Sequence, residues 1–366
     1  MSGSDTRHMA HALALGRRGL GRVAPWPSVG CVIVSDGQVV GRGTSDLATL
    51  RHAEIVALDQ AGARAKGATV YVTLEPCSHQ GRTPPCADAL IAAGVARVVV
   101  ATGDPNPLVA GQGLDRLRAA GVEVTTGLGD ADALRDHAGF LSVQLRKRPF
   151  LTLKLATTLD GRIATATGES QWITGPDARR KVHAMRANHD CVMVGGGTAR
   201  ADDPSLTVRD ADTSARPARL VVSRRLSLPW PNTLAQTIEQ APVWIAHGLD
   251  DAAQADIDRW REAGAKLLAV PASDGHVNLP HLFNLLAQEG LTRVFCEGGG
   301  ALAASLLGAG LVDDLIVFSA GKVLGAEGQP CIGALGISQL ADAPDFELVD
   351  VTRIGDDTMQ HWRLPA

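Results

Sequence analysis

Short apolar runs alternate with amphipathic segments along the first part of the chain, and this alternation predicts a layered α/β domain. Strands are expected at residues 31–34, 39–40, 69–74, 98–100 and 122–124, and helices at 7–15, 53–62, 87–93 and 114–120. Asp36-Gly37 separates the first two apolar runs and is typical of a tight turn. The domain is therefore expected to open with an antiparallel hairpin.

The alternation restarts after a basic run, 145–148, which ends at Pro149 and predicts a solvated linker rather than a binding patch. The apolar run 151–155 has a pattern typical of an edge strand. Further strands are expected at 192–194, 220–222 and 294–297. We therefore place a first domain at residues 1–146 and a second α/β domain at 147–366.

Length and composition favour an enzyme of two domains that acts on a small molecule. At 366 residues the chain exceeds one ordinary hydrophobic core. A formal net charge of -4 argues against the extended basic surface of nucleic-acid binders, and no apolar run is long enough to cross a bilayer. The sparse aromatic residues also give a nucleic-acid strand little to stack on.

Cysteine usage indicates a reducing compartment, and the expected location is the cytoplasm. The six cysteines lack the spacing of a secreted disulfide scaffold, and residues 1–19 lack the apolar stretch of a signal peptide. Cys31, Cys191, Cys296 and Cys331 are expected to be buried thiols.

One stretch combines the residue types of a catalytic zinc site. His52 and Glu54 open a predicted helix, Cys77 follows the strand at 69–74, and Cys86 ends the stretch. One imidazole and two thiolates supply three protein ligands, which leaves the fourth position of a tetrahedral Zn²⁺ ion open to water. Zinc lowers the pKa of that water toward neutrality, and Glu54, a carboxylate that is not a ligand, can carry protons to the leaving group. The pattern predicts hydrolytic deamination.

The spacing departs from the nucleobase-deaminase signature, because residues 78–85 separate the two cysteines where that signature has only two residues. Both cysteines are expected near helix starts, where the helix dipole favours thiolates. A buried histidine with two packed free cysteines is the alternative, since free cysteine is among the most buried residue types. The order of all the signature residues favours the metal site.

Glycines and arginines in the second domain are typical of sites for phosphate-bearing ligands. Three consecutive glycines follow each of two predicted strands and precede a helix, an arrangement in which backbone N–H groups approach a phosphate. Neither run is Gly-x-Gly-x-x-Gly, so the runs fit tight packing and cofactor binding alike. Arg186 and Arg209 suit a sugar phosphate, and Arg224-Arg225, just after a strand, suit the extra phosphate of NADPH.

Motifs along nearly the whole chain resemble those of the bifunctional deaminase/reductase family of riboflavin biosynthesis. They are His52-Ala53-Glu54, Glu75-Pro76-Cys77-Ser78-His79, Gly81-Arg82-Thr83-Pro84-Pro85-Cys86, Lys154, Leu159-Asp160-Gly161, Gly168-Glu169-Ser170-Gln171-Trp172-Ile173-Thr174, Asp202-Asp203-Pro204 and Glu297-Gly298-Gly299. The resemblance implies an N-terminal three-layer α/β/α domain like cytidine deaminase and a C-terminal α/β domain like dihydrofolate reductase. It implies removal of the 2-amino group of 2,5-diamino-6-ribosylamino-4(3H)-pyrimidinone 5′-phosphate, and then NADPH-dependent reduction of the ribosyl group to a ribityl chain.

The resemblance also implies site residues in the second domain. NADPH contacts would come from Ala156, Trp172, Thr198, Asp202, Ser223, Gly299, Gly300, Ala301, Leu302, Ala303, Ala304 and Ser305. Substrate contacts would come from Ser170, Arg186, Leu206, Arg209 and Glu297. These residues fit a hydride donor that lies across glycine turns, with arginines on the substrate phosphate.

Two positions in the first domain depart from the family pattern. Trp26 stands between two prolines where the family usually has asparagine, and Ser45 lies in a loop where a polar pocket residue, often histidine, is common. An indole donates one hydrogen bond and accepts none, so recognition of the pyrimidine would change. The alternatives to the family reaction are a deaminase with another substrate or weakened activity, and a first domain that is vestigial and structural.

The expected partners are a small pyrimidine ribosyl phosphate and a second copy of the chain, with neither nucleic acid nor membrane. For the homodimer, the apolar helix around Leu306-Leu307 is a candidate interface.

Overall fold

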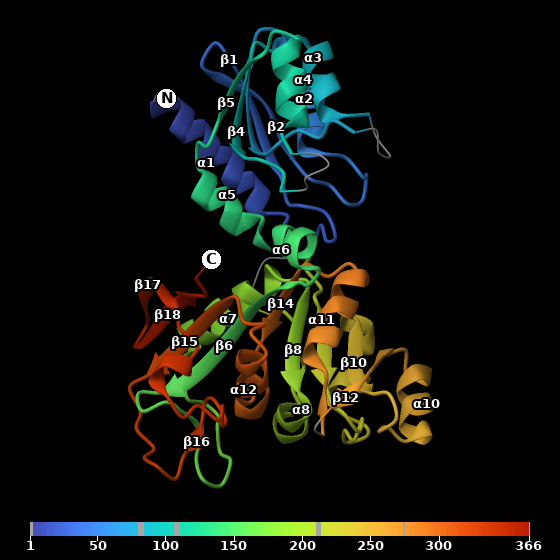
Figure 1. Cartoon of the computed structure of the whole chain (residues 1–366), viewed down its shortest axis with the longest axis vertical. Helices are drawn as coiled ribbons and strands as arrows, with labels where there is room; N and C mark the ends of the chain where they lie inside the picture. The colour runs from blue at the N-terminus through green and yellow to red at the C-terminus, as the bar shows by residue number, and fades with distance from the viewer. Residues whose placement is uncertain (1–2, 80–83, 106–109, 210–213, 274, 366) are drawn as a thin grey trace. The chain divides into compact units, whose positions relative to one another are not determined.

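The computed structural model describes residues 3–79, 84–105, 110–209, 214–273 and 275–365. Contacts divide the chain into two compact units, Met1–Lys147 and Arg148–Ala366, one residue beyond the boundary expected from the sequence (Figure 1). Residues 80–83, within the expected insertion between the two cysteines, lie outside the described residues. No described helix is long and apolar enough to cross a membrane.

The first unit contains the predicted strands and helices in the predicted order, together with η1, α5 and α6, which were not predicted; α6 includes the first two residues of the run expected to be the linker. Its elements are α1 (Gly3–Arg17), β1 (Gly30–Ser35), β2 (Gln38–Thr44), α2 (Ala53–Ala61), the 3₁₀ helix η1 (Gly62–Ala65), β3 (Thr69–Leu74), α3 (Cys86–Ala92), β4 (Arg97–Thr102), α4 (Gln112–Ala119), β5 (Glu123–Thr126), α5 (Asp130–Asp136) and α6 (Ala138–Arg146).

The sheet of the first unit has the order β2-β1-β3-β4-β5. β1 is antiparallel to both β2 and β3, and β3, β4 and β5 are parallel. Val34 pairs with Val39 around the turn, where Asp36 and Gly37 have φ angles of 49° and 74°. The predicted Asp-Gly hairpin is confirmed, since positive φ at both central residues matches the twist of the strands.

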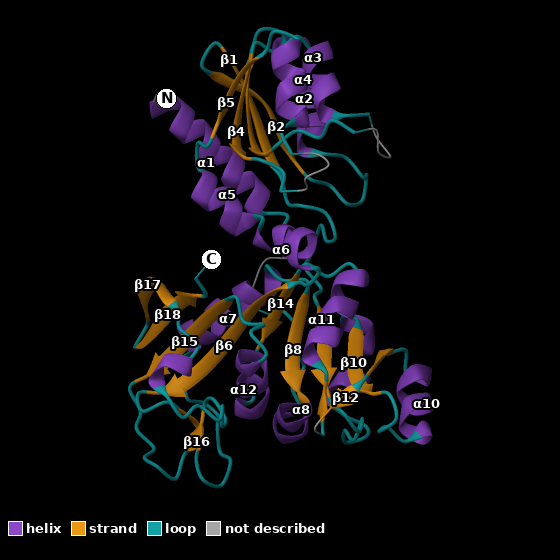
Figure 2. Cartoon of the chain, viewed as in Figure 1, coloured by secondary structure: helices purple, strands orange, loops and turns teal. Residues whose placement is uncertain are grey.

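Helices cover both faces of this sheet, as the alternation along β1 requires (Figure 2). Cys31 and Ile33 pack on the side of α2, α3 and α4, whereas Val32 and Val34 pack on the side of α1 and α5. Successive side chains of a strand point to opposite faces, so a run that is apolar at every position is buried on both. The predicted three-layer α/β/α arrangement is confirmed.

Glycines let α2 approach the sheet closely, and α2 begins at the candidate metal site. A Cβ on Gly43 would lie 1.9 Å from the carbonyl oxygen of Ala53, and one on Gly41 would lie 2.2 Å from that of Ala57. Any larger residue at these points of β2 would push α2 outward. The glycines of β2 therefore set the position of the helix that carries Glu54.

The second unit is larger and contains the remaining elements. They are β6 (Phe150–Thr158), β7 (Arg162–Ala164), α7 (Pro176–Ala187), β8 (Cys191–Gly195), α8 (Gly196–Asp202), β9 (Ala218–Val222), α9 (Thr233–Gln236), η2 (Ile238–Gln240), β10 (Val243–Gly248), α10 (Gln254–Glu262), β11 (Lys266–Val270), β12 (Ala272–Ser273), β13 (His276–Val277), α11 (Leu279–Gln288), β14 (Arg293–Cys296), α12 (Gly300–Gly308), β15 (Asp314–Ala320), β16 (Gln329–Pro330), η3 (Leu340–Asp342), β17 (Glu347–Ile354) and β18 (Asp357–Arg363).

The main sheet of this unit has the order β11-β10-β9-β8-β14-β6-β15-β18-β17. Its strands are parallel from β11 to β15, and β18 is antiparallel to both of its neighbours. The prediction that 151–155 forms an edge strand is wrong, because β6 pairs with β14 on one side and β15 on the other. The prediction was wrong because Lys154 interrupts the apolar run and suggested a solvent-exposed edge. Its side chain instead lines a cavity inside the unit.

The two glycine runs come together because β8 and β14 are neighbours in the sheet. Both strands are parallel, so their carboxyl ends lie at the same edge, where open α/β sheets place ligands. α8 begins directly after β8, and α12 begins at Gly300, after the short turn that follows β14. α11 and α12 cover one face of the sheet, and α7, α8 and α10 cover the other.

Candidate functional site

The three predicted metal ligands lie together in the first unit. His52 is the N-cap of α2, Cys86 is the first residue of α3, and Cys77 lies in the loop after β3. Their ligand atoms all lie within 4.8 Å of one another, with His52 Nδ1 at 3.2 Å from Cys86 Sγ and 3.6 Å from Cys77 Sγ. One nitrogen and two sulfurs, half-buried to buried, fit three positions of a tetrahedral zinc ion.

Hydrogen bonds prepare Cys77 to be a thiolate. The Cys86 side chain, with His52 and the Cys86 backbone N–H, lowers the pKa of Cys77 to about 4. That N–H lies 3.3 Å from Cys77 Sγ. Cys77 lies in the loop after β3 and accepts the backbone N–H of Cys86, the first residue of α3, so both cysteines lie at a helix start as expected. The pKa of the Cys86 thiol is raised instead, chiefly by its hydrogen bond to Cys77 and then by burial, so the helix start favours the thiolate of Cys77.

Glu54 lies in the first turn of α2 and is 4% exposed. Burial raises its pKa to about 7, so at neutral pH the carboxyl group can accept or release a proton. It shares a cavity of about 650 Å³ with His52 and Cys77. The structure therefore brings the predicted acid–base residue to the open side of the predicted metal site.

The two departures from the family pattern, Trp26 and Ser45, both line this cavity. The indole of Trp26 stands edge-on to the His52 ring, with ring centroids 5.7 Å apart. Ser45 is buried, and its hydroxyl donates to the carbonyl of Pro27 at 2.8 Å and accepts the N–H of Val29 at 3.0 Å. Ser45 therefore holds the loop that carries Trp26.

Glu75 directly precedes Pro76-Cys77 and ties a second loop to the metal site. Its carboxylate accepts backbone N–H groups from Asp104, Gly111 and Gly113 at 3.0 to 3.2 Å. The side chain is 5% exposed and lines the cavity, as does Asp104. These hydrogen bonds hold Asp104, Gly111 and Gly113 beside Glu75.

Two neighbouring cavities occupy the strand ends of the second unit, one of about 730 Å³ and one of about 990 Å³. Both are lined by Ile163, Ser170, Thr198, Asp202 and Gly299, so they meet at these residues. A dinucleotide and a second ligand can therefore lie in contact, as hydride transfer requires.

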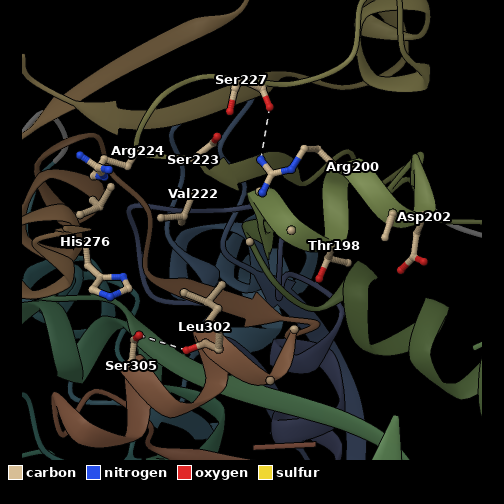
Figure 3. A pocket seen from close by; sticks show the side chains of 18 of the residues that line it. Thr198, Arg200, Asp202, Val222, Ser223, Arg224, Ser227, His276, Leu302 and Ser305 are labelled. Atoms are coloured by element: carbon tan, nitrogen blue, oxygen red, sulfur yellow. Dashed lines mark hydrogen bonds between the residues drawn. The ribbon is translucent and has the colours of Figure 1, made fainter. Parts of the chain in front are cut away.

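The smaller cavity holds most of the residues predicted to contact NADPH (Figure 3). Its lining includes Thr198, Asp202, Ser223, Gly299, Gly300, Ala301, Leu302 and Ser305. Gly299 has a φ of 95°, and a Cβ there would lie 2.7 Å from Thr198 Oγ1. Glycine is therefore needed for this close turn before α12, whose first residues, Gly300 to Leu302, line the cavity.

Four predicted NADPH contacts lie elsewhere. Ala156 and Trp172 line the larger cavity, and Trp172 is exposed with the Arg179 guanidinium 4.7 Å from its ring centroid. Ala303 and Ala304 are buried on the core side of α12 and are not among the lining residues of either cavity.

The larger cavity holds all five predicted substrate contacts: Ser170, Arg186, Leu206, Arg209 and Glu297. Arg186 pairs with Glu297, at 2.9 Å between Nη2 and Oε2, and also donates to the carbonyl of Thr207. Arg186 is thus engaged by a carboxylate, whereas the side chain of Arg209 is exposed at the cavity. Arg209 is the better placed of the two to meet a phosphate.

Lys154 approaches the Arg186–Glu297 pair from β6 and lines the same cavity. Burial lowers its pKa, and the charge of Arg186 acts in the same direction while Glu297 opposes both. A lysine with a lowered pKa in a cavity is a candidate proton donor.

Several lining residues escaped prediction. Arg179 and His183 lie on the same face of α7 as the predicted Arg186, at spacings of four and three residues, a pattern the sequence contains. Phe140 reaches the first cavity from α6, and His276 reaches the NADPH cavity from β13, both without a local signal.

The basic residues at the NADPH cavity differ in their partners. Arg224 pairs with Asp251, and Arg200 donates to the carbonyl of Ser227 at 3.2 Å (Figure 3). Arg225 is exposed beside them. The predicted pair Arg224-Arg225 thus lies next to Ser223 at the carboxyl end of β9.

Known proteins resemble both units. A family model described as the RibD C-terminal domain matches residues 149–360, and one described as the cytidine and deoxycytidylate deaminase zinc-binding region matches residues 2–102. The riboflavin biosynthesis protein RibD of Escherichia coli K12 is 44% identical over 98% of both chains, and that of Aquifex aeolicus is 39% identical over 96% of both.

Solved structures agree over the full length. The structure of Acinetobacter baumannii RibD is 38% identical, covers 99% of both chains and superposes with a TM-score of 0.87. A Thermotoga maritima diaminohydroxyphosphoribosylaminopyrimidine deaminase/5-amino-6-(5-phosphoribosylamino)uracil reductase is 32% identical over 99% of both chains, with a TM-score of 0.85. The chain belongs to the RibD family of riboflavin biosynthesis, whose bifunctional enzymes join a zinc-dependent deaminase to an NADPH-dependent reductase.

Proposed function

We propose that the first unit deaminates 2,5-diamino-6-ribosylamino-4(3H)-pyrimidinone 5′-phosphate and that the second unit reduces the ribosyl group of the product. The observation that carries this proposal is the convergence of His52, Cys77 and Cys86 on one point, with Glu54 lining the same cavity as His52 and Cys77. A vestigial first unit would not need a buried carboxyl group beside an intact ligand set.

In the deaminase unit, His52, Cys77 and Cys86 hold the zinc ion. When bound, zinc activates water for attack on the ring carbon that bears the amino group. Glu54 takes the proton of the water and delivers protons to the ring nitrogen and to the departing ammonia, and its pKa near neutrality suits both tasks.

In the reductase unit, the residues at the glycines that follow β8 and β14 would hold NADPH, which would supply a hydride when bound. The substrate occupies the larger cavity, where Arg209 meets its phosphate and the Arg186–Glu297 pair orients its sugar. Lys154 donates the proton that the ring oxygen of the ribose needs when the sugar opens.

The test uses the full chain with the pyrimidinone phosphate and NADPH. Ammonia release and NADPH oxidation are both expected. Glu54→Gln or removal of zinc by a chelator is expected to lower ammonia release by about 100-fold or more, because general acid–base catalysis contributes that much. Reduction of the already deaminated substrate is expected to continue in both cases.

Glu123→Gln is the matched control, since it removes an exposed carboxylate of the same unit. Both reactions should persist in this variant. If the wild-type chain releases neither ammonia nor NADP⁺, the proposal is wrong.

We also propose a homodimer, with β17 as the interface strand. β17 is the last strand of the large sheet, and Leu348, Val349 and Val351 expose 38 to 54% of their surface. The expectation that Leu306 and Leu307 supply the interface is wrong, because both are buried in the core. Glu347 and Arg353 lie near opposite ends of β17, so an antiparallel second copy would bring opposite charges face to face.

The proposed location is the cytoplasm. All six cysteines are free, and two of them are the zinc ligands, which must stay reduced to bind metal.

A further inference from the structure

The wall of the deaminase cavity is mainly apolar beyond the metal site. Eight of its fifteen described lining residues are apolar: Pro25, Trp26, Pro27, Val29, Leu47, Leu50, Leu74 and Phe140. A ligand in this cavity therefore contacts aliphatic side chains and two aromatic ones, Trp26 and Phe140, as well as the metal ligands.

Most polar groups of the same wall are already engaged by the protein. Ser45 bonds the backbone at Pro27 and Val29, and Glu75 accepts three backbone N–H groups. His52 and Cys77 belong to the metal site, and Glu54 to proton transfer. His79 and Asp104 are the other polar residues of the described lining, so polar residues are fewer than apolar ones around the substrate ring.

Trp26 is held firmly at this wall. Its backbone N–H donates to the carbonyl of Val23 at 2.9 Å, and the next residue, Pro27, accepts the Ser45 hydroxyl. The indole is half-buried and stands at 81° to the ring plane of His52. A pre-positioned aromatic ring costs little conformational entropy when a ligand packs on it.

We propose that Trp26 determines the specificity of the deaminase cavity by packing its indole against the heteroaromatic ring of the substrate. This inference rests on the proposed deamination and names the group that selects its substrate. Recognition depends on a planar ring of the right size, and only weakly on a hydrogen-bond pattern around it. Loss of the indole weakens substrate binding and leaves the chemical step in place.

The experiment measures KM and kcat for ammonia release by the full, zinc-loaded chain and its Trp26 variants. Trp26→Ala is expected to raise KM about 10-fold with kcat within about threefold, since stacking on an aromatic side chain contributes roughly that much per base. Trp26→Phe keeps an aromatic face and is expected to recover KM to within about threefold of wild type. Trp26→Asn is expected to behave like Trp26→Ala.

Zinc content and reductase turnover are measured on every sample, and Leu134→Ala, an exposed apolar residue of the same unit, is the control variant. A KM unchanged in Trp26→Ala overturns the inference, as does a higher kcat/KM in Trp26→Asn, which would mean that the indole obstructs the ring. Loss of zinc from Trp26→Ala also overturns it, because Trp26 would then support His52 instead. If the wild-type chain retains zinc but releases no ammonia, the proposed deamination itself is wrong. That result differs from a change seen only in the Trp26 variants, which concerns the role of Trp26 alone.

Discussion

Burial decides the charge of His189, which follows α7 in the reductase unit. Its ring nitrogens lie 2.7 Å from the carbonyl oxygen of Met185 and 3.0 Å from Thr152 Oγ1, and its ring packs on Phe295. Burial, with a smaller effect of the Arg293 charge, lowers the pKa of His189 to about 4. The side chain is therefore neutral in the folded protein at every pH at which the enzyme is expected to work.

This lowered pKa predicts how stability depends on pH. Below its ordinary pKa of 6.5, His189 takes up a proton in the unfolded chain, while the folded chain resists until about pH 4. Stability therefore falls as pH falls through this window, by about 2 kcal/mol at pH 5 from this residue alone. Urea unfolding, followed by loss of reductase activity, is expected to show a smaller decrease between pH 7.5 and 5 in His189→Gln than in wild type. Equal decreases in the two proteins would contradict this account.

Sequence order identified the site residues whose chemistry is local. The family resemblance named Arg186 and Glu297, but nothing in the sequence predicted the contacts that such residues make with distant partners. His52, Glu54, Cys77 and Cys86 fall in one short stretch, so their types and order were sufficient to predict a metal site. Glu75 binds a loop about thirty residues later, and Arg186 meets Glu297 more than a hundred residues away. No local pattern records such pairs, because the fold creates them.

At the scale of elements, the glycines of β2 allow α2, the helix that starts at the metal site, to pack closely on the sheet. Gly43→Ala would place a Cβ 1.9 Å from the Ala53 carbonyl and 2.8 Å from the Ala57 nitrogen. We expect α2 to move outward, with a loss of about 2–3 kcal/mol of stability, the usual cost of overpacking, and with weaker zinc binding. Zinc titration and urea unfolding of the variant measure both effects.

Gly3→Ala is the control for this prediction, because the position is helical and has open space around it. Its stability is expected to stay within about 0.5 kcal/mol of wild type, as surface substitutions usually do. Normal zinc affinity in Gly43→Ala would show that the close approach of β2 and α2 does not position His52.

Apolar periodicity predicted the positions of most strands and helices in the sequence, but it did not predict which strands pair with one another in the sheets. The strands of the first unit appear where alternation predicted them, and the Asp36-Gly37 turn fixed one pairing. β6 was misplaced at an edge because Lys154 interrupts its apolar run, although the lysine points into a cavity. β14 inserts between β6 and β8, an order that depends on contacts between distant segments.

At the scale of the whole molecule, each activity has its own unit and its own cavity. The metal ligands and the first cavity lie within Met1–Lys147, and the two connected cavities lie within Arg148–Ala366. Because each unit has its own core, deamination can be abolished without loss of the reductase activity. The tests with Glu54→Gln and with a chelator depend on this separation.

The proposed dimer gives the last prediction. An edge strand with exposed apolar side chains is a ready surface for pairing with another strand, and charges on such a strand block pairing. In analytical ultracentrifugation, the wild-type chain is expected to have twice the 38.2 kDa mass of one chain. The double variant Leu348→Lys/Val351→Lys is expected to have a mass of 38.2 kDa. Leu340→Lys, which changes a highly exposed leucine outside β17, should remain a dimer. Retained reductase activity in the double variant would show that the unit still folds. A wild-type monomer, or a double variant that still dimerises, would exclude β17 as the interface.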